Sequence, residues 1–359
     1  PVVDININPK NPIIGNRSFG ENKVNVTDKA IAFTRGMQSQ NVLANAKHFP
    51  GHGDTASDSH HTLPVIDFDI SRLDSIELYP YKKLFEENLG SVMTAHLSVP
   101  SLEPNKKLPS SLSKKVVTDL LIQQMGFKGL IITDGLNMKG AANYSSASEI
   151  NLAAILAGND LLLIPQDVPA TVKLFKKAIK NKQLTIKRLE HSVRKILMAK
   201  YWAGLHNYKP VSLENLQEDL NSKTDVLLNR ELIKKSITVI KNVKEIIPIQ
   251  HLDTKKIAYV KFGEDDSTPF VKMLRNYAKV DVISGASSSD LLSKLKSYNL
   301  VIIGYHTSNA HPWKGFKFKK NAIATIQKIA KSKKVILNIF SSPYSLLDFK
   351  SFKNIEGLV

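Results

Sequence analysis

Residues 47–64, KHFPGHGDTASDSHHTLP, hold four of the ten histidines of the chain, together with two aspartates, two glycines and two prolines. The residues before them, NVLANA at 41–46, form a short and mostly apolar run, which is typical of a buried strand. A proline and two glycines then end regular structure. The stretch therefore predicts a buried strand that delivers Lys47 and His48 to a loop of titratable side chains, where catalytic residues tend to lie.

The loop also allows two alternative interpretations. A metal site is the first, because His48 and His52 are four residues apart. Pro50 and Gly51 lie between them, however, the chain has no cysteine, and the motif H-E-x-x-H is absent, so we predict no metal. The second is a loop that folds on bonds between its own histidines and the backbone, although residues 51–61 carry no large apolar side chain that would account for this composition.

On both sides of this stretch, short apolar runs alternate with segments whose apolar residues have helical spacing. This alternation indicates parallel strands joined by right-handed crossovers. Polar side chains follow several strand ends, as they do at the carboxyl face of a TIM-type barrel. A complete barrel needs about eight strands, so we predict an incomplete TIM-type (β/α)8 barrel over residues 1–205, with its early strands missing. We expect strands at 2–7, 41–48, 90–96, 129–134 and 160–164, and helices at 26–39 (capped by Thr27), 71–89, 110–124, 148–157, 168–180 and 185–203.

The second half of the chain predicts another α/β domain. Residues 206–223 are polar and are expected to form a linker, and 224–359 to form an α/β sandwich with a mainly parallel sheet. A dinucleotide fingerprint G-x-G-x-x-G is absent. His306 and His311 are expected to be loop residues rather than catalytic ones. We expect strands at 236–240, 256–262, 280–283, 300–305 and 335–340, separated by helices at 269–278, 288–297 and 322–330.

Composition narrows the classes of function. With 359 residues and 42% hydrophobic content the chain should fold as two globular domains, and no apolar run is long enough for a membrane span. Zero cysteines exclude disulfides and thiol catalysis. The net charge of +18 is spread over lysines on helix faces, which favours a solvated basic surface, or attraction to an anionic polymer such as a cell wall, over nucleic-acid binding.

The two ends of the sequence resemble interrupted strands, and no methionine begins it. We therefore expect a fragment cut at both ends, without its targeting segment, and fusion to further domains is open. Its compartment is open too, and we favour a periplasmic or secreted location over the cytoplasm.

Four kinds of side chain suggest the chemistry. Asp134 ends an apolar strand, where it either caps the next turn or attacks an anomeric carbon in retaining glycoside hydrolysis. The proton donor would be His60, with Asp58 two residues earlier and on the same side of an extended segment; a neighbouring carboxylate stabilises the imidazolium. His61 ranks second for this role. Donors for sugar hydroxyls or a carbonyl would come from Arg17, Lys47 and His48, although Arg17 fits a plain surface position as well.

Together with NRSFG at 16–20 and GLIITDGLNMKG at 129–140, the histidine-rich stretch resembles the family 3 glycoside hydrolases, most closely their N-acetyl-β-glucosaminidase branch. The resemblance covers residues 1–205, and more loosely the rest as the second domain of two-domain members. It implies Asp134 as nucleophile, a mobile loop with the acid/base pair His60 and Asp58, and N-acetylglucosamine bound by Arg17, Lys47 and His48. The doubled histidine, the missing strands and the absence of a sugar-contacting aspartate near an early strand depart from the family pattern.

From the residues and this resemblance together we predict a retaining exo-β-N-acetylglucosaminidase that acts on peptidoglycan fragments, a carbohydrate-binding enzyme without a cofactor. One alternative is a β-glucosidase of the same family, whose branch takes a carboxylic acid from the second domain and lacks the D-S-H element. The other is a catalytically silent muropeptide-binding module.

Overall fold

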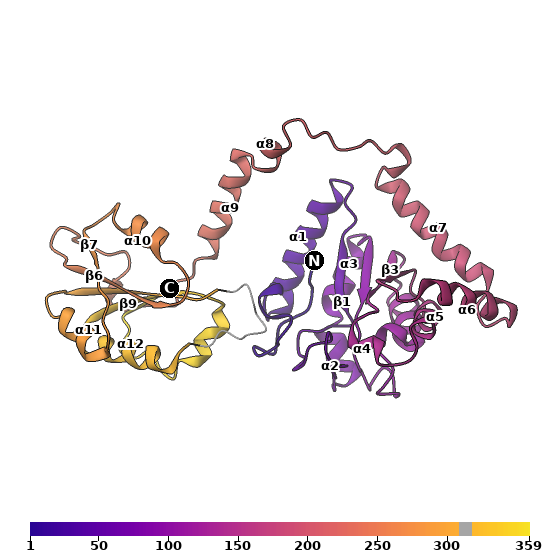
Figure 1. The fold of residues 1–359 in the computed structure, drawn as a ribbon, viewed down its shortest axis with the longest axis horizontal. Coiled ribbons are helices and arrows are strands. Elements are labelled where there is room, and N and C mark those ends of the chain that lie inside the picture. Colours follow the sequence, from indigo (N-terminus) through magenta and orange to yellow (C-terminus); the bar gives the residue numbers. More distant parts are fainter. Residues whose placement is uncertain (309–317) are drawn as a thin grey trace. The chain divides into compact units, whose positions relative to one another are not determined.

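The computed structural model describes residues 1–308 and 318–359, and the chain divides into two compact units, Pro1–Lys209 and Pro210–Val359 (Figure 1). Each unit has its own sheet and its own hydrophobic core. No helix of the described residues is both long and apolar enough to cross a membrane. His311 lies outside the described residues, and the linker at 206–223 stays a prediction.

The sheet of the first unit has four parallel strands in the order β1 (Asn45–Phe49), β2 (Ser91–Thr94), β3 (Leu130–Gly135) and β4 (Leu161–Leu163). Because all four run the same way, their carboxyl ends meet at one edge of the sheet, which is where sites form in parallel α/β folds. Within the part of the chain that the structure describes, this sheet is open, with β1 and β4 as its outermost strands.

The strand predicted at residues 2–7 is wrong in length. A parallel bridge joins Val2 to Lys47, and the N–H of Val3 donates to the Lys47 carbonyl at 2.8 Å. The N–H of Asn6 then donates to the carbonyl of Gly20 instead of to the sheet. The loop that follows thus takes over the backbone groups that would have continued the strand.

Helices alternate with the strands, as expected from the apolar periodicity. The predicted helix 71–89 is two helices, because Pro80, at the start of the second one, lacks the N–H that a continuous helix would need. The first helix is capped by Asn22, which accepts from two N–H groups, whereas the expected cap Thr27 lies inside it and donates to the Lys23 carbonyl. The helices of this unit are α1 (Lys23–Gln38), α2 (Ile70–Ser75), α3 (Tyr79–Glu86), the π-helix η3 (Lys115–Gln124), α4 (Lys139–Ala142), α5 (Ala147–Ala157), α6 (Val168–Lys180) and α7 (Ile186–Trp202), with short 3-10 turns η1 (Gly15–Arg17) and η2 (Ser110–Leu112).

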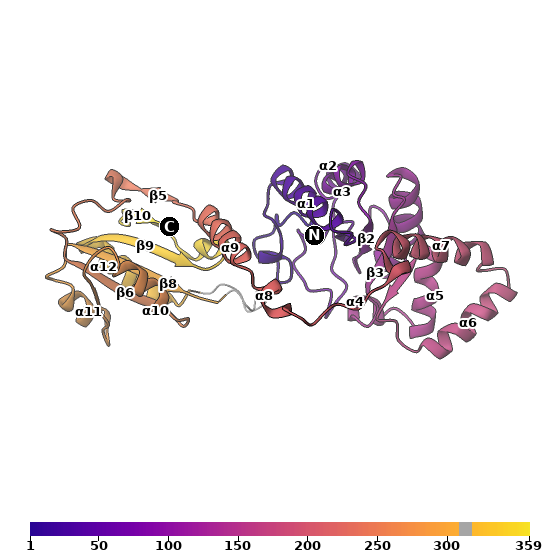
Figure 2. The same cartoon turned by 90° about the horizontal axis from the view of Figure 1, so that it is seen from above.

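The main core of the first unit lies between the strands and the helices α1, α3 and η3, of which α1 and α3 lie side by side (Figures 1 and 2). Val92 of β2 and Ile131 of β3 are fully buried there against Leu84 and Val117. Each such side chain contributes about 1.5–3 kcal/mol on burial. This packing makes the strand ends a rigid platform for side chains that follow them.

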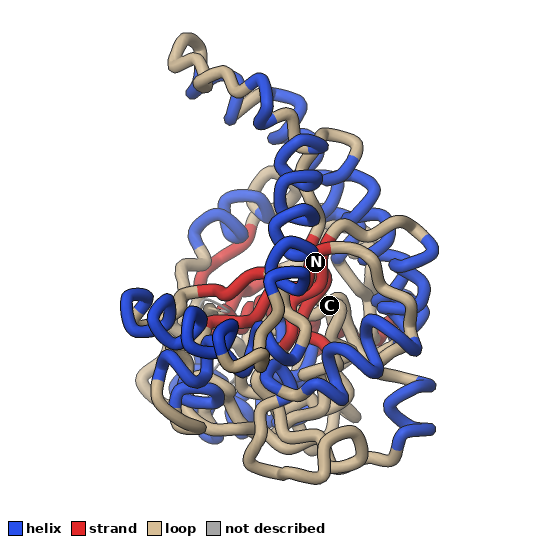
Figure 3. Tube along the Cα trace, turned by 90° about the vertical axis from the view of Figure 1, so that its right-hand side faces the viewer, coloured by secondary structure: helices blue, strands red, loops and turns tan. Residues whose placement is uncertain are grey.

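The second unit contains a six-stranded sheet in the order β5 (Lys241–Asn242), β10 (Gly357–Leu358), β9 (Lys334–Phe340), β8 (Leu300–His306), β6 (Ile257–Gly263) and β7 (Val280–Val282). It is parallel except where β10 pairs with β5, so the prediction of a mainly parallel sheet is correct. In Figure 3 the strands are red and the helices blue. The remaining elements are η4 (Leu205–Asn207) at the end of the first unit, then α8 (Leu216–Leu220), α9 (Lys223–Ser236), η5 (Val243–Glu245), α10 (Thr268–Leu274), α11 (Ser288–Lys294), α12 (Lys320–Ser332) and η7 (Pro343–Asp348).

Alternate residues of these strands enter two different cores. Val301 and Val335 pack against α11 and α12 on one face, and Ile302 and Ile336 pack against α10 on the other. The strand predicted at 236–240 is wrong, because pairing with β10 begins only at the N–H of Ile240 and the preceding residues continue α9 or lie exposed. His306 is also not a loop residue, since it ends β8.

Candidate active site

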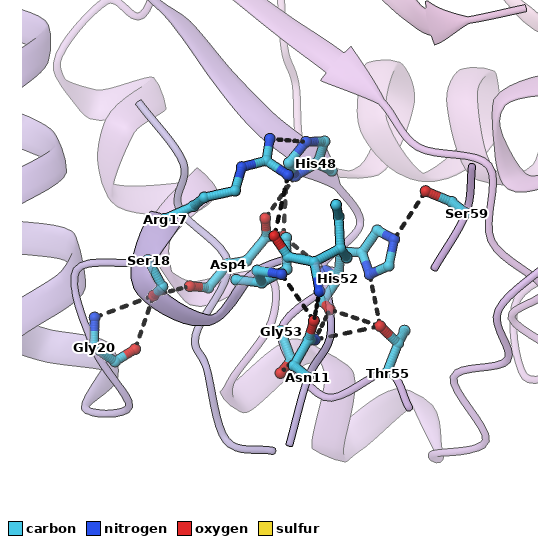
Figure 4. Close-up of polar contacts among 12 residues, drawn as sticks. Asp4, Asn11, Arg17, Ser18, Gly20, His48, His52, Gly53, Thr55 and Ser59 are labelled. Atoms are coloured by element: carbon cyan, nitrogen blue, oxygen red, sulfur yellow. Dashed lines mark hydrogen bonds and ion pairs between the residues drawn. The ribbon is translucent and has the colours of Figure 1, made fainter. Parts of the chain in front are cut away.

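The floor of the candidate site is the carboxylate of Asp4, which lies buried against the end of β1 (Figure 4). Its Oδ2 is 2.6 Å from Nδ1 of His48, and its Oδ1 accepts from the backbone N–H groups of His48 and His52 at 3.2 and 2.7 Å. Burial by itself raises the pKa of the Asp4 carboxyl, but the contacts with His48 and His52 outweigh burial, so that the pKa is lowered. Asp4 is therefore ionised and fixes the orientation of the His48 ring.

Arg17 reaches the same ring from the other side. It ends η1, in the loop that leads from Asp4 to α1, and its Nη2 is 3.4 Å from Nε2 of His48 (Figure 4). Ser18 holds the loop in place, because its hydroxyl donates to the carbonyl of Asp4 at 2.6 Å. The structure thus brings together Arg17 and His48, two of the three predicted sugar-binding residues.

Lys47, the third of them, is half-buried in β1. Its backbone N–H donates to the carbonyl of Pro1 at 3.1 Å. The peptide bonds Lys47–His48 and Phe49–Pro50 on either side of His48 are cis.

His52 connects the floor to the loop above it. Its Nδ1 is 2.6 Å from the hydroxyl of Thr55, and its Nε2 is 3.1 Å from the hydroxyl of Ser59. Burial lowers the pKa of His52 to about 4, against a smaller opposing effect of the Asp4 carboxylate. His52 therefore links the buried carboxylate, which its backbone N–H contacts, to Ser59, which its neutral imidazole contacts. Ser59 lies between the two residues of the predicted acid/base pair.

Three further contacts hold the histidine-rich loop. The carboxamide of Asn11 donates to the carbonyls of His52 and Gly53 at 2.8 and 3.2 Å. Gly53 sits so close to the Ile5 carbonyl that a Cβ atom would lie 1.9 Å from the oxygen, which only glycine permits. The third contact is an ion-pair network: Arg72 of α2 binds the carboxylates of Glu77, at 2.6 and 2.7 Å, and of Asp54, at 3.3 Å.

The predicted acid/base pair lies at the exposed end of this loop. Nδ1 of His60 is 2.7 Å from Oδ1 of Asp58, and the backbone N–H of His60 donates to the same oxygen at 2.8 Å. The segment is a turn, in which the N–H groups of His61 and Thr62 donate to the Asp58 carbonyl, so the extended segment assumed from the spacing is wrong. Burial raises the pKa of Asp58, but its bonds to His60 outweigh that effect and lower the pKa.

Asp134 lies near the carboxyl end of β3, half-buried, with its Oδ1 accepting from the N–H of Gly135. His96, after β2, is buried beside it, with Nε2 3.0 Å from the Gly135 carbonyl and Nδ1 2.7 Å from the Ser111 hydroxyl. Burial lowers the pKa of His96, and the Asp134 carboxylate opposes that shift. Asp134 also raises the pKa of His52, as a minor effect, so the ends of β1, β2 and β3 share one electrostatic environment.

Gly140 of α4 brings the histidine-rich loop to this strand end. Its N–H donates to the carbonyl of Ser59 at 3.1 Å, and a Cβ atom there would lie about 3 Å from the carbonyls of Ser59 and Thr62 and from His96. The loop with Asp58 and His60 therefore packs on the segment that follows Asp134.

Sequence reasoning missed Asp4, His52, His96 and Gly140 as parts of the site. A signal for Asp4 existed, since a carboxylate inside a run of apolar residues has to find a partner when buried. His96 had a signal too, since it ends the strand predicted at 90–96, where polar side chains meet at the carboxyl edge of the sheet. His52 and Gly140 became recognisable only through their contacts in the fold. No group of three or more histidine or acidic side chains that could hold a metal ion is found within the residues described.

Comparisons with known proteins identify the family of this chain. Residues 1–199 match the glycosyl hydrolase family 3 N-terminal domain. The chain is 32% identical over 264 residues to beta-hexosaminidase A of Pseudoalteromonas piscicida, which covers 67% of this chain and 43% of the relative. It is 28% identical over 257 residues to a beta-N-acetylglucosaminidase/beta-glucosidase of Cellulomonas fimi, and this match covers 69% of this chain and 46% of the relative. The chain thus spans less than half the length of these relatives.

Among solved structures, the chain is similar to a family 3 β-N-acetylglucosaminidase from Paenibacillus sp. str. FPU-7, with 26% identity, a TM-score of 0.79, and coverage of 100% of this chain and 69% of that one. This likeness confirms the predicted fold class, a TIM-like barrel domain followed by an α/β sandwich, with the barrel sheet open in the described residues. The chain belongs to glycosyl hydrolase family 3.

Proposed function

We propose that this chain carries the site of a retaining exo-β-N-acetylglucosaminidase, which removes terminal N-acetylglucosamine from peptidoglycan fragments. The observation that carries the proposal is the pair of Asp58 and His60, with 2.7 Å between Nδ1 and Oδ1 and 52% of the imidazole side chain exposed. This pair is held on a loop that packs on the segment after Asp134. A proton donor and a carboxylate nucleophile on one face are what retaining hydrolysis requires.

In the first step, Asp134 attacks the anomeric carbon. The bond between Asp134 and that carbon forms as the bond to the leaving oxygen breaks, and the imidazolium of His60 gives its proton to that oxygen. Asp58 orients the ring and stabilises its positive charge. The products are a glycosyl ester on Asp134, a neutral His60 and a free aglycone.

In the second step, His60 acts as a base. It takes a proton from a water molecule whose oxygen bonds to the anomeric carbon, and the ester bond breaks to return the Asp134 carboxylate. The sugar leaves with its original anomeric configuration, and His60 is protonated again. Two inversions at one carbon account for retention.

Sugar recognition is assigned to Arg17, Lys47 and His48. The guanidinium and ammonium are donors for hydroxyl and carbonyl oxygens, and the Asp4 carboxylate holds His48 in one orientation. A preference for N-acetylglucosamine is supported by the names of the relatives from Pseudoalteromonas piscicida and Paenibacillus. The net charge of +18 suits an anionic polymer such as peptidoglycan.

The second candidate is β-glucosidase activity, which the double name of the Cellulomonas fimi relative favours. Turnover of aryl N-acetylglucosaminide and aryl glucoside by the full-length protein distinguishes the two. We expect the N-acetylglucosaminide to be preferred and an activated 5-fluoro sugar to label Asp134. Equal or greater turnover of the glucoside would reverse the assignment, and absence of any covalent label and turnover would indicate a binding module.

The Asp134→Asn variant tests the nucleophile. An amide does not form the glycosyl ester, so we expect kcat to fall by several orders of magnitude, on the scale of about 10³-fold or more, with the melting temperature retained. Asp28→Asn, which changes an exposed carboxylate in α1, is the matched control and should retain full activity. Substantial turnover of an aryl substrate by Asp134→Asn would refute the role.

A further inference from the structure

The imidazole of His96 contacts the residue that follows the candidate nucleophile. His96 comes two residues after the end of β2, and its surface is 0% exposed. Its Nε2 is 3.0 Å from the carbonyl oxygen of Gly135, and its Nδ1 is 2.7 Å from the hydroxyl of Ser111. Both ring nitrogens therefore have a partner, and one of these partners belongs to the backbone next to Asp134.

These two partners fix the tautomer of the His96 ring. A carbonyl oxygen only accepts, so Nε2 carries the hydrogen and donates to Gly135. Nδ1 is then the acceptor, and the Ser111 hydroxyl donates to it. Burial lowers the pKa of His96, although the Asp134 carboxylate opposes that shift, so the ring is neutral near pH 7. A neutral ring does not compete for the Asp134 carboxylate as an ion-pair partner.

Ser111 is itself held by buried contacts. Its N–H donates to the Ala95 carbonyl at 3.1 Å, and its carbonyl accepts from the carboxamide of Asn159 at 2.8 Å. The oxygen of the same carboxamide accepts from the Thr94 hydroxyl at 2.8 Å. Thr94, Ser111 and Asn159 are all fully buried. The Ser111 hydroxyl is therefore fixed relative to the end of β2, and with it the ring that it contacts.

The backbone of Gly135 determines how the Asp134 carboxylate is held. The N–H of Gly135 donates to Oδ1 of Asp134 at 2.8 Å. Glycine lacks a Cβ atom and loses more conformational freedom on folding than any other residue, so its backbone has to be held by its contacts. On its carbonyl side, Gly135 accepts from the N–H of Met138 at 2.9 Å and from the His96 ring. The bond from His96 thus restricts a flexible residue whose N–H binds the candidate nucleophile.

We propose that His96 is a positioning residue for the nucleophile: it holds the backbone of Gly135, which in turn holds the Asp134 carboxylate in the orientation that attacks the anomeric carbon. The inference rests on the proposed function, because it takes Asp134 as the nucleophile. It adds a role for a histidine that is too deeply buried to contact the substrate. A displacement of about 1 Å between reacting groups can lower a rate by about 10²-fold. Loss of the His96 bond should therefore slow the attack by Asp134 more than it weakens substrate binding.

The test follows the covalent labelling of Asp134 in the full-length protein by an activated 5-fluoro sugar. The leaving group of this sugar needs no proton, so the maximal rate of labelling reports the nucleophilic attack alone. In His96→Leu, which has no donor for the Gly135 carbonyl, we expect this rate to fall by about 10- to 100-fold. The sugar concentration at half-maximal rate should change by less than about twofold, since binding groups are untouched.

The variant His96→Gln should rescue the rate. The amide nitrogen of glutamine can replace Nε2 of the imidazole as the donor to the Gly135 carbonyl. We therefore expect His96→Gln to label Asp134 at a rate within about fivefold of the wild type, as for one retained hydrogen bond in a slightly altered geometry. A merely structural role of His96 would lower the melting temperature of both variants without separating their labelling rates.

Two further variants complete the experiment. Thr171→Val removes a buried hydroxyl of α6 that accepts from the Asn151 carboxamide at 2.7 Å, so it should lower stability and leave the labelling rate unchanged. Ser111→Ala keeps the ring of His96 but removes the donor to its Nδ1, and it replaces His96→Leu if that variant does not fold. We expect Ser111→Ala to lower the maximal labelling rate by about three- to tenfold, as for the loss of one hydrogen bond.

The outcomes separate this inference from the proposed function. An unchanged labelling rate in folded His96→Leu, or in Ser111→Ala, would overturn the inference alone. Equal losses in His96→Gln and His96→Leu, or a similar loss in Thr171→Val, would overturn it as well. A wild type that is not labelled at Asp134 and does not hydrolyse an aryl N-acetylglucosaminide would refute the proposed function and the inference with it.

Discussion

Two aspartate–histidine pairs in the first unit have nearly the same distance between imidazole and carboxylate, but one pair is buried and the other is exposed to solvent. Nδ1 lies 2.6 Å from the carboxylate in the pair of His48 with Asp4, and 2.7 Å in the pair of His60 with Asp58. The side chains of the first pair are 5% and 0% exposed, and those of the second are 52% and 18% exposed. Distance alone therefore does not tell a structural pair from a pair that can exchange protons with a substrate.

The difference lies in what else the carboxylate holds. Asp4 also accepts from two backbone N–H groups of distant residues, so it ties the N-terminal segment to the end of β1. Asp58 bonds to the ring and backbone of one neighbour, His60, and organises a single turn. His306 of the second unit resembles the buried type, since its ring bonds to the Tyr259 hydroxyl at 2.6 Å and stacks on Phe340. Access to solvent, together with a carboxylate partner, marks the candidate acid.

The largest effect that tests this comparison concerns His60. If the exposed pair donates the proton, His60→Ala should lower kcat by about 10²–10⁴-fold for a disaccharide and by much less for an aryl glycoside whose leaving group needs no proton. His61→Ala is the matched control, because His61 is also exposed but one residue further along the turn. Steady-state kinetics on both substrates measure the effect. A swap of behaviour between the two variants would move the role to His61.

The buried pair should act on stability instead. Asp4→Ala leaves the N–H groups of His48 and His52 without their acceptor, and breaking a buried charged pair destabilises by about 3–5 kcal/mol. Asp58→Ala, at the exposed pair, should change stability by less than about 1 kcal/mol. Calorimetric melting of both variants makes the comparison. An equal loss in the two would show that burial does not separate the pairs.

The same region predicts how stability depends on pH. The pKa of His52 is lowered to about 4 from an ordinary value of 6.5, so the unfolded chain binds the extra proton between these values. The contribution of the neutral His52 ring to the free energy of unfolding is fully present above about pH 6.5 and is lost as pH falls toward 4. The lowered pKa of Asp4 adds a further loss at lower pH, because its carboxylate must be protonated on acid unfolding. Wild-type melting between pH 7 and 4 should show this decline.

Features that depend on neighbouring residues could be predicted from the sequence, whereas features that depend on distant residues could not. Local patterns predicted α6 with its observed bounds, the strand before His48 and the contact of Asp58 with His60, since these depend on neighbours in the chain. The two backbone N–H groups that donate to the Asp4 carboxylate lie 44 and 48 residues away, and no local pattern encodes such a separation. The strand expected at 236–240 failed for the same reason, because pairing with the distant β10 decides where β5 begins.

The smallest expected effect concerns the charge of Asp58. Its bonds to His60 lower the pKa of Asp58 against the opposing effect of burial, so the carboxylate that faces the ring is ionised. Without that charge, the basic limb of the profile of kcat/KM against pH should move to lower pH by about one unit or less. Asp58→Ala removes both the charge and the acceptor, whereas Asp58→Asn keeps an oxygen that accepts from the ring and the backbone.

The two variants therefore separate charge from orientation. Both should move the basic limb, but kcat at the optimum should fall further in Asp58→Ala, by about tenfold, because only there is the ring no longer held in place. KM should change less than kcat, since Arg17 and His48 are untouched. The measurement requires a substrate whose leaving group needs protonation. A basic limb that stays in place in both variants would show that another group donates the proton, and the exposed pair would then be no more catalytic than the buried one.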